Sequence, residues 1–170
     1  MVTIQIPVST FSRKIILAKY QEPVKLSPSK LLHQQLSIVM ERPYTNITRL
    51  RGMLNDTLAF EVENKKAPLL LKRGWQIGNH LHSYHVEFML NHIQAKTMCG
   101  IPALTAMKAF YDLFEIDEDD FQMDSAYKRW QRFLEEEKHL SFFDKKMPKK
   151  KDTNCQNTAS LLKVDLPYTV

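Results

Sequence analysis

The chain has 170 residues, of which 44% are hydrophobic, with a formal net charge of +5 and a sequence pI of about 9.1. This composition excludes a chain that is disordered throughout, and no apolar run approaches the length of a membrane-spanning helix. The two cysteines, Cys99 and Cys155, lack CxxC spacing, which predicts a reducing compartment, the cytoplasm, and no disulfide framework.

The positive charge is concentrated toward the two ends of the chain, and the middle of the chain is acidic. Basic clusters attract polyanions, so the charge pattern favours nucleic acid as a partner. The alternative is that a surplus of +5 is ordinary for a protein of 20.0 kDa.

Residues 1–42 predict a strand followed by two helices. Apolar and polar side chains alternate over residues 2–8, which places Thr3 and Gln5 on the face opposite the apolar residues. Pro7 has no amide donor, so this strand ends there or lies at the edge of a sheet. A helix follows over about residues 10–20 with Arg13 toward solvent, and a second one begins at Ser27 and Pro28.

The rest of the chain predicts a small amount of strand and several helices. Residues 43–78 contain a short strand at 57–63 and loops, and residues 79–140 form a three-helix region, with helices at about 79–99, 102–114 and 123–139. Residues 141–170 predict a mobile basic tail, whose segment 161–170 alternates and could pair with a protein partner. The predicted fold class is therefore α+β and dominated by helices.

The first strand needs a partner for its backbone hydrogen-bonding groups. One solution is the same strand of a second copy, because two antiparallel strands form a ribbon that fits the major groove of DNA, with Thr3 and Gln5 at the base edges. The other solution is pairing with residues 57–63 inside one α+β domain.

The stretch VTIQIPVSTFSRKIILAKYQEPVKLSPSKLLHQQLSIVM resembles the ribbon-helix-helix family of dimeric DNA-binding proteins. The shared features are an alternating strand ending in Ile-Pro, a helix, a hydroxyl-rich turn and a second amphipathic helix, over about forty residues. The resemblance implies a homodimer that reads bases through Thr3 and Gln5 and holds a phosphate at Ser27, Ser29 and Lys30. The sequence departs from the family in its neutral outward strand residues and its longer connector.

Residues 102–139 predict two helices joined by a turn. Lys128, Arg129 and Arg132 lie away from an apolar stripe formed by Tyr127, Trp130 and Leu134. Such cations bind guanine edges or phosphates, and the alternative is a solvated face of a helical hairpin. The phrase AFYDLFEIDEDDFQMDSAYKRW is similar to small helical proteins of phages and bacterial mobile elements, without a named family.

Two polar clusters suggest metal chemistry and have simpler explanations. His80, His82, His85 and His92 share one predicted helix, but His80 and His82 diverge by about 200° on a helix and no HExxH motif accompanies them. This pattern favours a polar surface with one packed histidine. The carboxylates of residues 117–120 are better explained as helix caps than as metal ligands.

Taken together, these patterns predict a cytoplasmic, non-catalytic protein without metal or cofactor that binds double-stranded DNA as a dimer, as a phage or mobile-element regulator. The predicted DNA contacts are Thr3, Gln5, Arg13, Ser27, Ser29, Lys30, Lys128, Arg129 and Arg132. The first alternative is an interaction or structural component of a larger phage or defence-related assembly. A metal-dependent enzyme that uses the histidine cluster is a weaker alternative.

Overall fold

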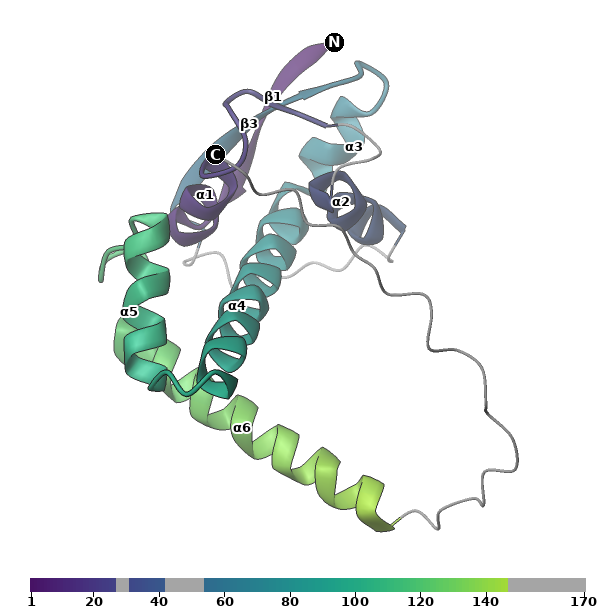
Figure 1. Ribbon diagram of the computed structural model, residues 1–170. Coiled ribbons are helices and arrows are strands. Elements are labelled where there is room, and N and C mark those ends of the chain that lie inside the picture. Colours follow the sequence, from purple (N-terminus) through teal and green to yellow (C-terminus); the bar gives the residue numbers. More distant parts are fainter. Residues whose placement is uncertain (27–30, 42–53, 147–170) are drawn as a thin grey trace, which may run out of the picture. The chain divides into compact units, whose positions relative to one another are not determined.

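The computed structural model describes residues 1–26, 31–41 and 54–146 (Figure 1). Residues 1–133 form one compact unit, and helix α6 begins inside this unit and continues beyond it. In chain order the elements are β1 (Val2–Val8), α1 (Thr10–Leu17), β2 (Val24–Lys25), α2 (Leu31–Glu41), β3 (Asp56–Val62), α3 (Ala67–Lys72), α4 (Gly74–Met98), α5 (Ala103–Phe114) and α6 (Met123–Lys146). The predicted α+β fold class, dominated by helices, is confirmed.

A three-stranded sheet has the order β1-β3-β2. Strand β1 pairs antiparallel with β3, with Ile4 opposite Phe60 and Ile6 opposite Leu58, and β2 pairs parallel with β3. The first predicted solution, in which the first strand completes its ladder with the same strand of a second copy, is therefore wrong, because β3 of the same chain is its partner. The alternative, pairing with the strand predicted at 57–63, is confirmed.

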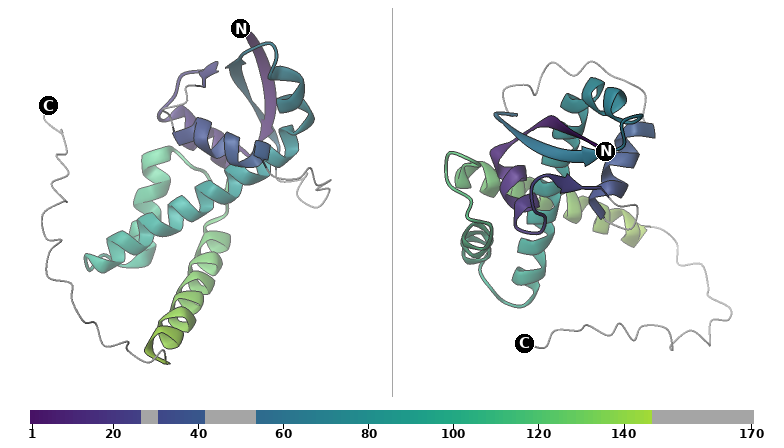
Figure 2. Two further views of the ribbon diagram at one scale, coloured as in Figure 1. Left: turned by 90° about the vertical axis from the view of Figure 1, so that its right-hand side faces the viewer. Right: turned by 90° about the horizontal axis from the view of Figure 1, so that it is seen from above.

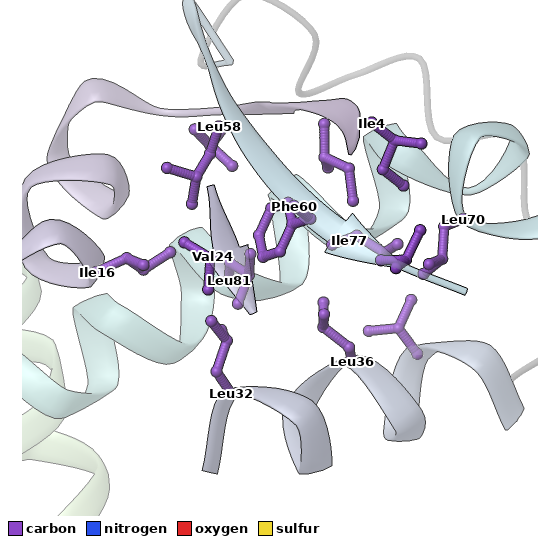
Figure 3. Packing of buried hydrophobic residues seen from close by; sticks show 14 of the residues in the cluster. Ile4, Ile16, Val24, Leu32, Leu36, Leu58, Phe60, Leu70, Ile77 and Leu81 are labelled. Atoms are coloured by element: carbon purple, nitrogen blue, oxygen red, sulfur yellow. The ribbon is translucent and has the colours of Figure 1, made fainter. Parts of the chain in front are cut away.

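One face of the sheet carries the main hydrophobic core. Ile4, Ile6 and Val8 of β1 are almost fully buried, because alternate side chains of a strand point to the same face. Figure 2 shows α2 and α4 on the same side of the strands, and Figure 3 shows apolar side chains from both helices and the sheet meeting there. The core cluster includes Val24, Leu32, Leu36, Phe60, Leu70, Ile77 and Leu81. The predicted units 1–42, 43–78 and 79–140 thus contribute to a common core.

Helices α4 and α5 pack against each other and bury a second set of side chains. Met89 and Ile93 of α4 and Met107 and Phe110 of α5 have at most 1% of their surface exposed. The connector after α5 turns at Glu115, which has a left-handed φ of 53°. The Tyr111 hydroxyl donates a hydrogen bond of 2.8 Å to the Phe121 carbonyl, which fixes this connector on α5.

Several predicted boundaries differ from the structure. Residues 67–78, predicted as loop, form α3 and the start of α4, and β2 was not predicted at all. The final helix extends to Lys146, so residues 141–146 belong to α6 and not to a mobile tail. The rest of that predicted tail, including 161–170, lies outside the described residues. No helix in the described part of the chain is long and apolar enough to cross a membrane.

Candidate nucleic-acid interface

Strand β1 has one edge away from β3, and the start of α4 covers part of it. The Ala59 amide of β3 donates a hydrogen bond to Glu22 Oε1, so the backbone groups of Ala59 point away from β1. Because backbone groups alternate in direction along a strand, those of Leu58 and Phe60 face β1. The opposite edge of β1 therefore carries the backbone groups of Thr3, Gln5 and Pro7.

Helix α4 reaches this edge at Pro7. A Cβ built on Gly78 would overlap the Pro7 carbonyl oxygen, and one built on Gly74 would lie 3.1 Å from Pro7 Cδ. Since Pro7 also lacks an amide donor, a second copy of β1 has no continuous edge along which to pair. Thr3 and Gln5 are exposed, as predicted, but on the face of a three-stranded sheet.

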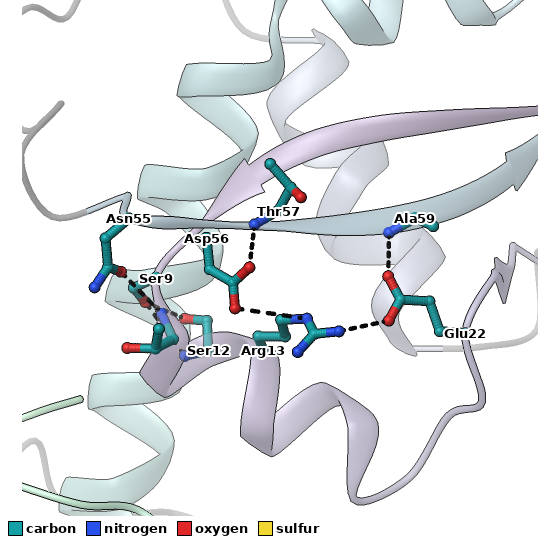
Figure 4. A network of polar contacts seen from close by, with 9 residues as sticks. Ser9, Ser12, Arg13, Glu22, Asn55, Asp56, Thr57 and Ala59 are labelled. Carbon is teal, nitrogen blue, oxygen red and sulfur yellow. Dashed lines mark hydrogen bonds and ion pairs between the residues drawn. The ribbon is translucent and has the colours of Figure 1, made fainter. Parts of the chain in front are cut away.

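Arg13, predicted to contact DNA, is engaged within the fold. Its Nη2 lies 2.7 Å from Glu22 Oε2 and its Nε lies 3.6 Å from Asp56 Oδ2 (Figure 4). The hydrogen bond from the Ala59 amide, followed by the one from Arg13, lowers the pKa of Glu22 below its ordinary value despite partial burial. Arg13 thus links α1 to the sheet. Ser27, Ser29 and Lys30 lie outside the described residues.

The first turns of α6 present a polar band to solvent. Lys128 and Arg132 are exposed and lie one turn apart, while Ala126 and Trp130 on the opposite face are buried. Gln131 is also exposed, and Tyr127 is 36% exposed rather than part of the buried stripe, which corrects its prediction. On a helical wheel centred between Ala126 and Trp130, Gln131 lies about 120° away, on the outer face, and Tyr127 lies about 80° away, at the border of the buried face.

Arg129 lies between the buried and exposed faces of α6. Its guanidinium carbon is 5.5 Å from the centre of the Phe121 ring, within the range of a cation–π contact. Phe121 in turn packs against Phe11 of α1, with ring centres 4.9 Å apart. Arg129 is thus held against the core, whereas Lys128 and Arg132 project from it.

The acidic connector before α6 is tied to α1 by one lysine. Lys14 Nζ lies 2.8 Å from Asp117 Oδ2 and 2.6 Å from Asp120 Oδ2, and it donates to the Glu115 carbonyl at 2.5 Å. The hydrogen bonds to Asp117 and then to Asp120 raise the pKa of Lys14. Glu118 accepts from the Met123 amide at 3.1 Å, as predicted for helix-capping carboxylates.

Two of the four clustered histidines are buried, where one was predicted. His82 Nδ1 lies 3.0 Å from Ser9 Oγ, and its ring packs edge-on against Phe11. His85 lies one turn later and is 5% exposed. Burial lowers the pKa of each histidine to about 4, so both are neutral at pH 7. Within the described residues, no group of three or more His, Cys, Asp or Glu side chains is arranged to hold a metal ion.

Comparison of this chain with protein-family models, with curated proteins and with solved structures finds no significant match.

Proposed function

We propose that this protein binds double-stranded DNA through the first turns of α6, which enter the major groove. The side chains that contact the DNA are Tyr127, Lys128, Gln131 and Arg132. The observation that carries the proposal is that two exposed cations and an exposed amide share one face of a helix whose other face is buried in the fold.

The chemistry of this band suits a duplex. Lysine and arginine bind phosphates or guanine edges, and a glutamine amide pairs with adenine. Residues 123–132 span about 15 Å along the helix axis, comparable with the roughly 12 Å width of the major groove. Glu135, Glu136 and Glu137 follow on the same helix and would repel phosphates, which limits the contact to the first part of α6.

The contacts that hold the start of α6 in place favour a DNA-binding helix over a loosely solvated surface. The Tyr111–Phe121 hydrogen bond and the Lys14 ion pairs fix the connector that leads into α6. Lys14 also offsets the charge of two connector carboxylates, which reduces their repulsion of a phosphate at the start of the helix. A helix held in this way needs no further ordering of its backbone on binding, which reduces the entropic cost of association.

The proposed interface is confined to α6 and leaves out the predicted contacts of the first strand. Arg13 is left out because Glu22 and Asp56 already neutralise it. Dimerisation and a phage or mobile-element setting remain predictions, and in that setting the DNA and the protein meet in the cytoplasm. The proposal contains no catalytic step and no cofactor.

Fluorescence anisotropy with a labelled duplex of about three helical turns tests the proposal. The full-length protein should bind with a Kd of about 1–100 µM or tighter near 150 mM NaCl, because phosphate contacts alone supply that affinity. The Lys128→Gln/Arg132→Gln variant should bind at least about tenfold more weakly.

The Lys65→Gln/Lys66→Gln variant is the matched control. It removes the same charge from the β3–α3 connection, where both lysines pair with Glu63, and should bind like wild type. Equal losses in both variants would refute the assignment to α6. Absence of duplex binding, together with a protein that co-purifies, would favour the assembly-component alternative.

A further inference from the structure

A pocket of about 190 Å³ lies among α1, the turn that follows α1, and helices α2, α4 and α5. Most of its wall is aliphatic or aromatic, with Ile15, Ile16, Leu32, Phe88 and Phe114 among the lining residues. Phe88 is 41% exposed, so the wall presents an aromatic ring to solvent. A concave apolar surface of this kind is typical of sites for small organic molecules.

Lys19 is the one charged side chain among the described residues that line this pocket. Burial lowers the pKa of His85 to about 4, so its imidazole is neutral at pH 7. Burial, followed by the charge of Glu87, raises the pKa of Tyr84, which therefore stays neutral as well. Glu87 itself does not line the pocket. The charge that an occupant meets is thus the single positive charge of Lys19.

The ammonium group of Lys19 is available to an occupant. Lys19 is exposed in the turn that ends α1, and it forms no ion pair with a carboxylate in the described part of the chain. Lys14 on the same helix is, by contrast, held by Asp117 and Asp120. Binding sites of this class combine an apolar wall with a few polar groups that orient the ligand. An apolar pocket bordered by one unpaired cation therefore matches a molecule with an apolar body and a single negative charge.

The size of the pocket limits the apolar body. A cavity of about 150 Å³ holds benzene, whereas drug-sized ligands occupy about 300–1,000 Å³. The pocket thus has room for one six-membered ring, with the charged group left at its mouth. The rings of Phe88 and Phe114 lie edge-on with their centres 6.1 Å apart, and such rings favour an aromatic occupant.

We propose that this pocket binds a small aromatic monocarboxylate, whose ring lies against Phe88 and Phe114 and whose carboxylate pairs with Lys19. The apolar wall supplies most of the affinity, because an ion pair at an exposed lysine contributes little, and Lys19 supplies the preference for an anion. None of the described lining residues belongs to α6. The inference therefore stands or falls independently of DNA binding.

Hydrocinnamate is the probe, because a short flexible arm joins its ring to its carboxylate. It should bind the full-length protein with a Kd of about 1 mM in isothermal titration calorimetry at low ionic strength. Hydrocinnamamide has the same shape without the charge and should bind about three- to fivefold more weakly. Propanoate keeps the carboxylate without the ring and should show no saturation up to about 10 mM.

Replacement of Lys19 tests the origin of this preference. Lys19→Gln should bind hydrocinnamate and hydrocinnamamide equally, and Lys19→Arg should restore the preference for the acid, because it restores the positive charge. Lys108→Gln is the matched control, since Lys108 is exposed on α5 and does not line the pocket, and it should keep the wild-type preference. Both lysines are exposed, so these variants should fold as the wild type does.

Methyl ¹³C spectra of the isoleucines locate the site in the wild-type protein. Hydrocinnamate should shift the signals of Ile15 and Ile16, which line the pocket, and leave those of Ile4 and Ile6 in β1 unchanged. Shifts at Ile4 and Ile6 in place of Ile15 and Ile16 would place the ligand elsewhere and overturn the inference.

Three binding results would also overturn it. They are the absence of saturable hydrocinnamate binding at several millimolar, equal binding of the acid and the amide by the wild type, and an undiminished preference for the acid in Lys19→Gln.

Discussion

Replacing Gly78 by alanine tests the packing of α4 against β1. Gly78 lies in the second turn of α4, where an alanine would normally stabilise the helix by about 1 kcal/mol. Here the added Cβ would overlap the Pro7 carbonyl oxygen and lie 2.7 Å from Leu54 Cδ1. Overpacking of this kind costs about 1–3 kcal/mol, and a strand carbonyl yields less readily than a side chain, so the upper end applies. The expected net loss of unfolding free energy is about 2 kcal/mol.

Urea unfolding followed by far-UV circular dichroism at pH 7.5 measures this loss. Gly74→Ala is the matched control, because its Cβ would meet only the Pro7 ring, at 3.1 and 3.7 Å, and should change stability by less than about 0.5 kcal/mol. The slope of free energy against urea should be the same for all three proteins. If Gly78→Ala is as stable as wild type, α4 does not press on β1, and the edge of β1 is open to a second chain.

Two further predictions concern titratable side chains. Because the folded-state pKa values of His82 and His85 are depressed from 6.5 to about 4, the folded protein binds fewer protons than the unfolded chain in this window, and stability falls as the pH drops. Urea titrations should show wild type losing about 2.5 kcal/mol more than His85→Phe between pH 7 and pH 4.5, and parallel losses would contradict the burial of a neutral His85. Lys14→Met should cost about 1 kcal/mol, because it leaves Asp120 without its cation, and the cost should shrink in 0.5 M NaCl since ion pairs are screened. A salt-independent cost would show that the Lys14 chain matters through packing and not through Asp117 and Asp120.

Hydrophobic periodicity predicted the strands and helices that bury only one face. The alternation over residues 2–8 and 57–63 identified β1 and β3, and apolar spacing located α2, α4, α5 and the start of α6. β2 escaped prediction because two residues, Val24 and Lys25, show no periodicity. The helical stretch at Gly74–Gly78 was assigned to a loop because of its glycines, which in the structure allow close packing on Pro7, a contact that exists only in three dimensions.

The candidate site was predictable in part. Lys128, Arg129 and Arg132 were identified as outward side chains from their position away from an apolar stripe. Lys128 and Arg132 are exposed, whereas Arg129 packs against the Phe121 ring. Arg13 was misjudged because its partners, Glu22 and Asp56, lie nine and 43 positions away and meet it only through the fold. His82 and Ser9 are 73 positions apart, and the sequence contains no local signal for their contact.

The salt dependence of duplex binding tests the central claim most directly. The logarithm of the association constant, plotted against the logarithm of NaCl concentration from about 50 to 200 mM, has a slope proportional to the number of phosphate contacts. If Lys128 and Arg132 both contact DNA phosphates, Lys128→Gln/Arg132→Gln should reduce that slope by about 2, and Lys65→Gln/Lys66→Gln should leave it unchanged. A wild-type slope near zero, or an identical slope in the α6 variant, would contradict the claim that α6 binds DNA.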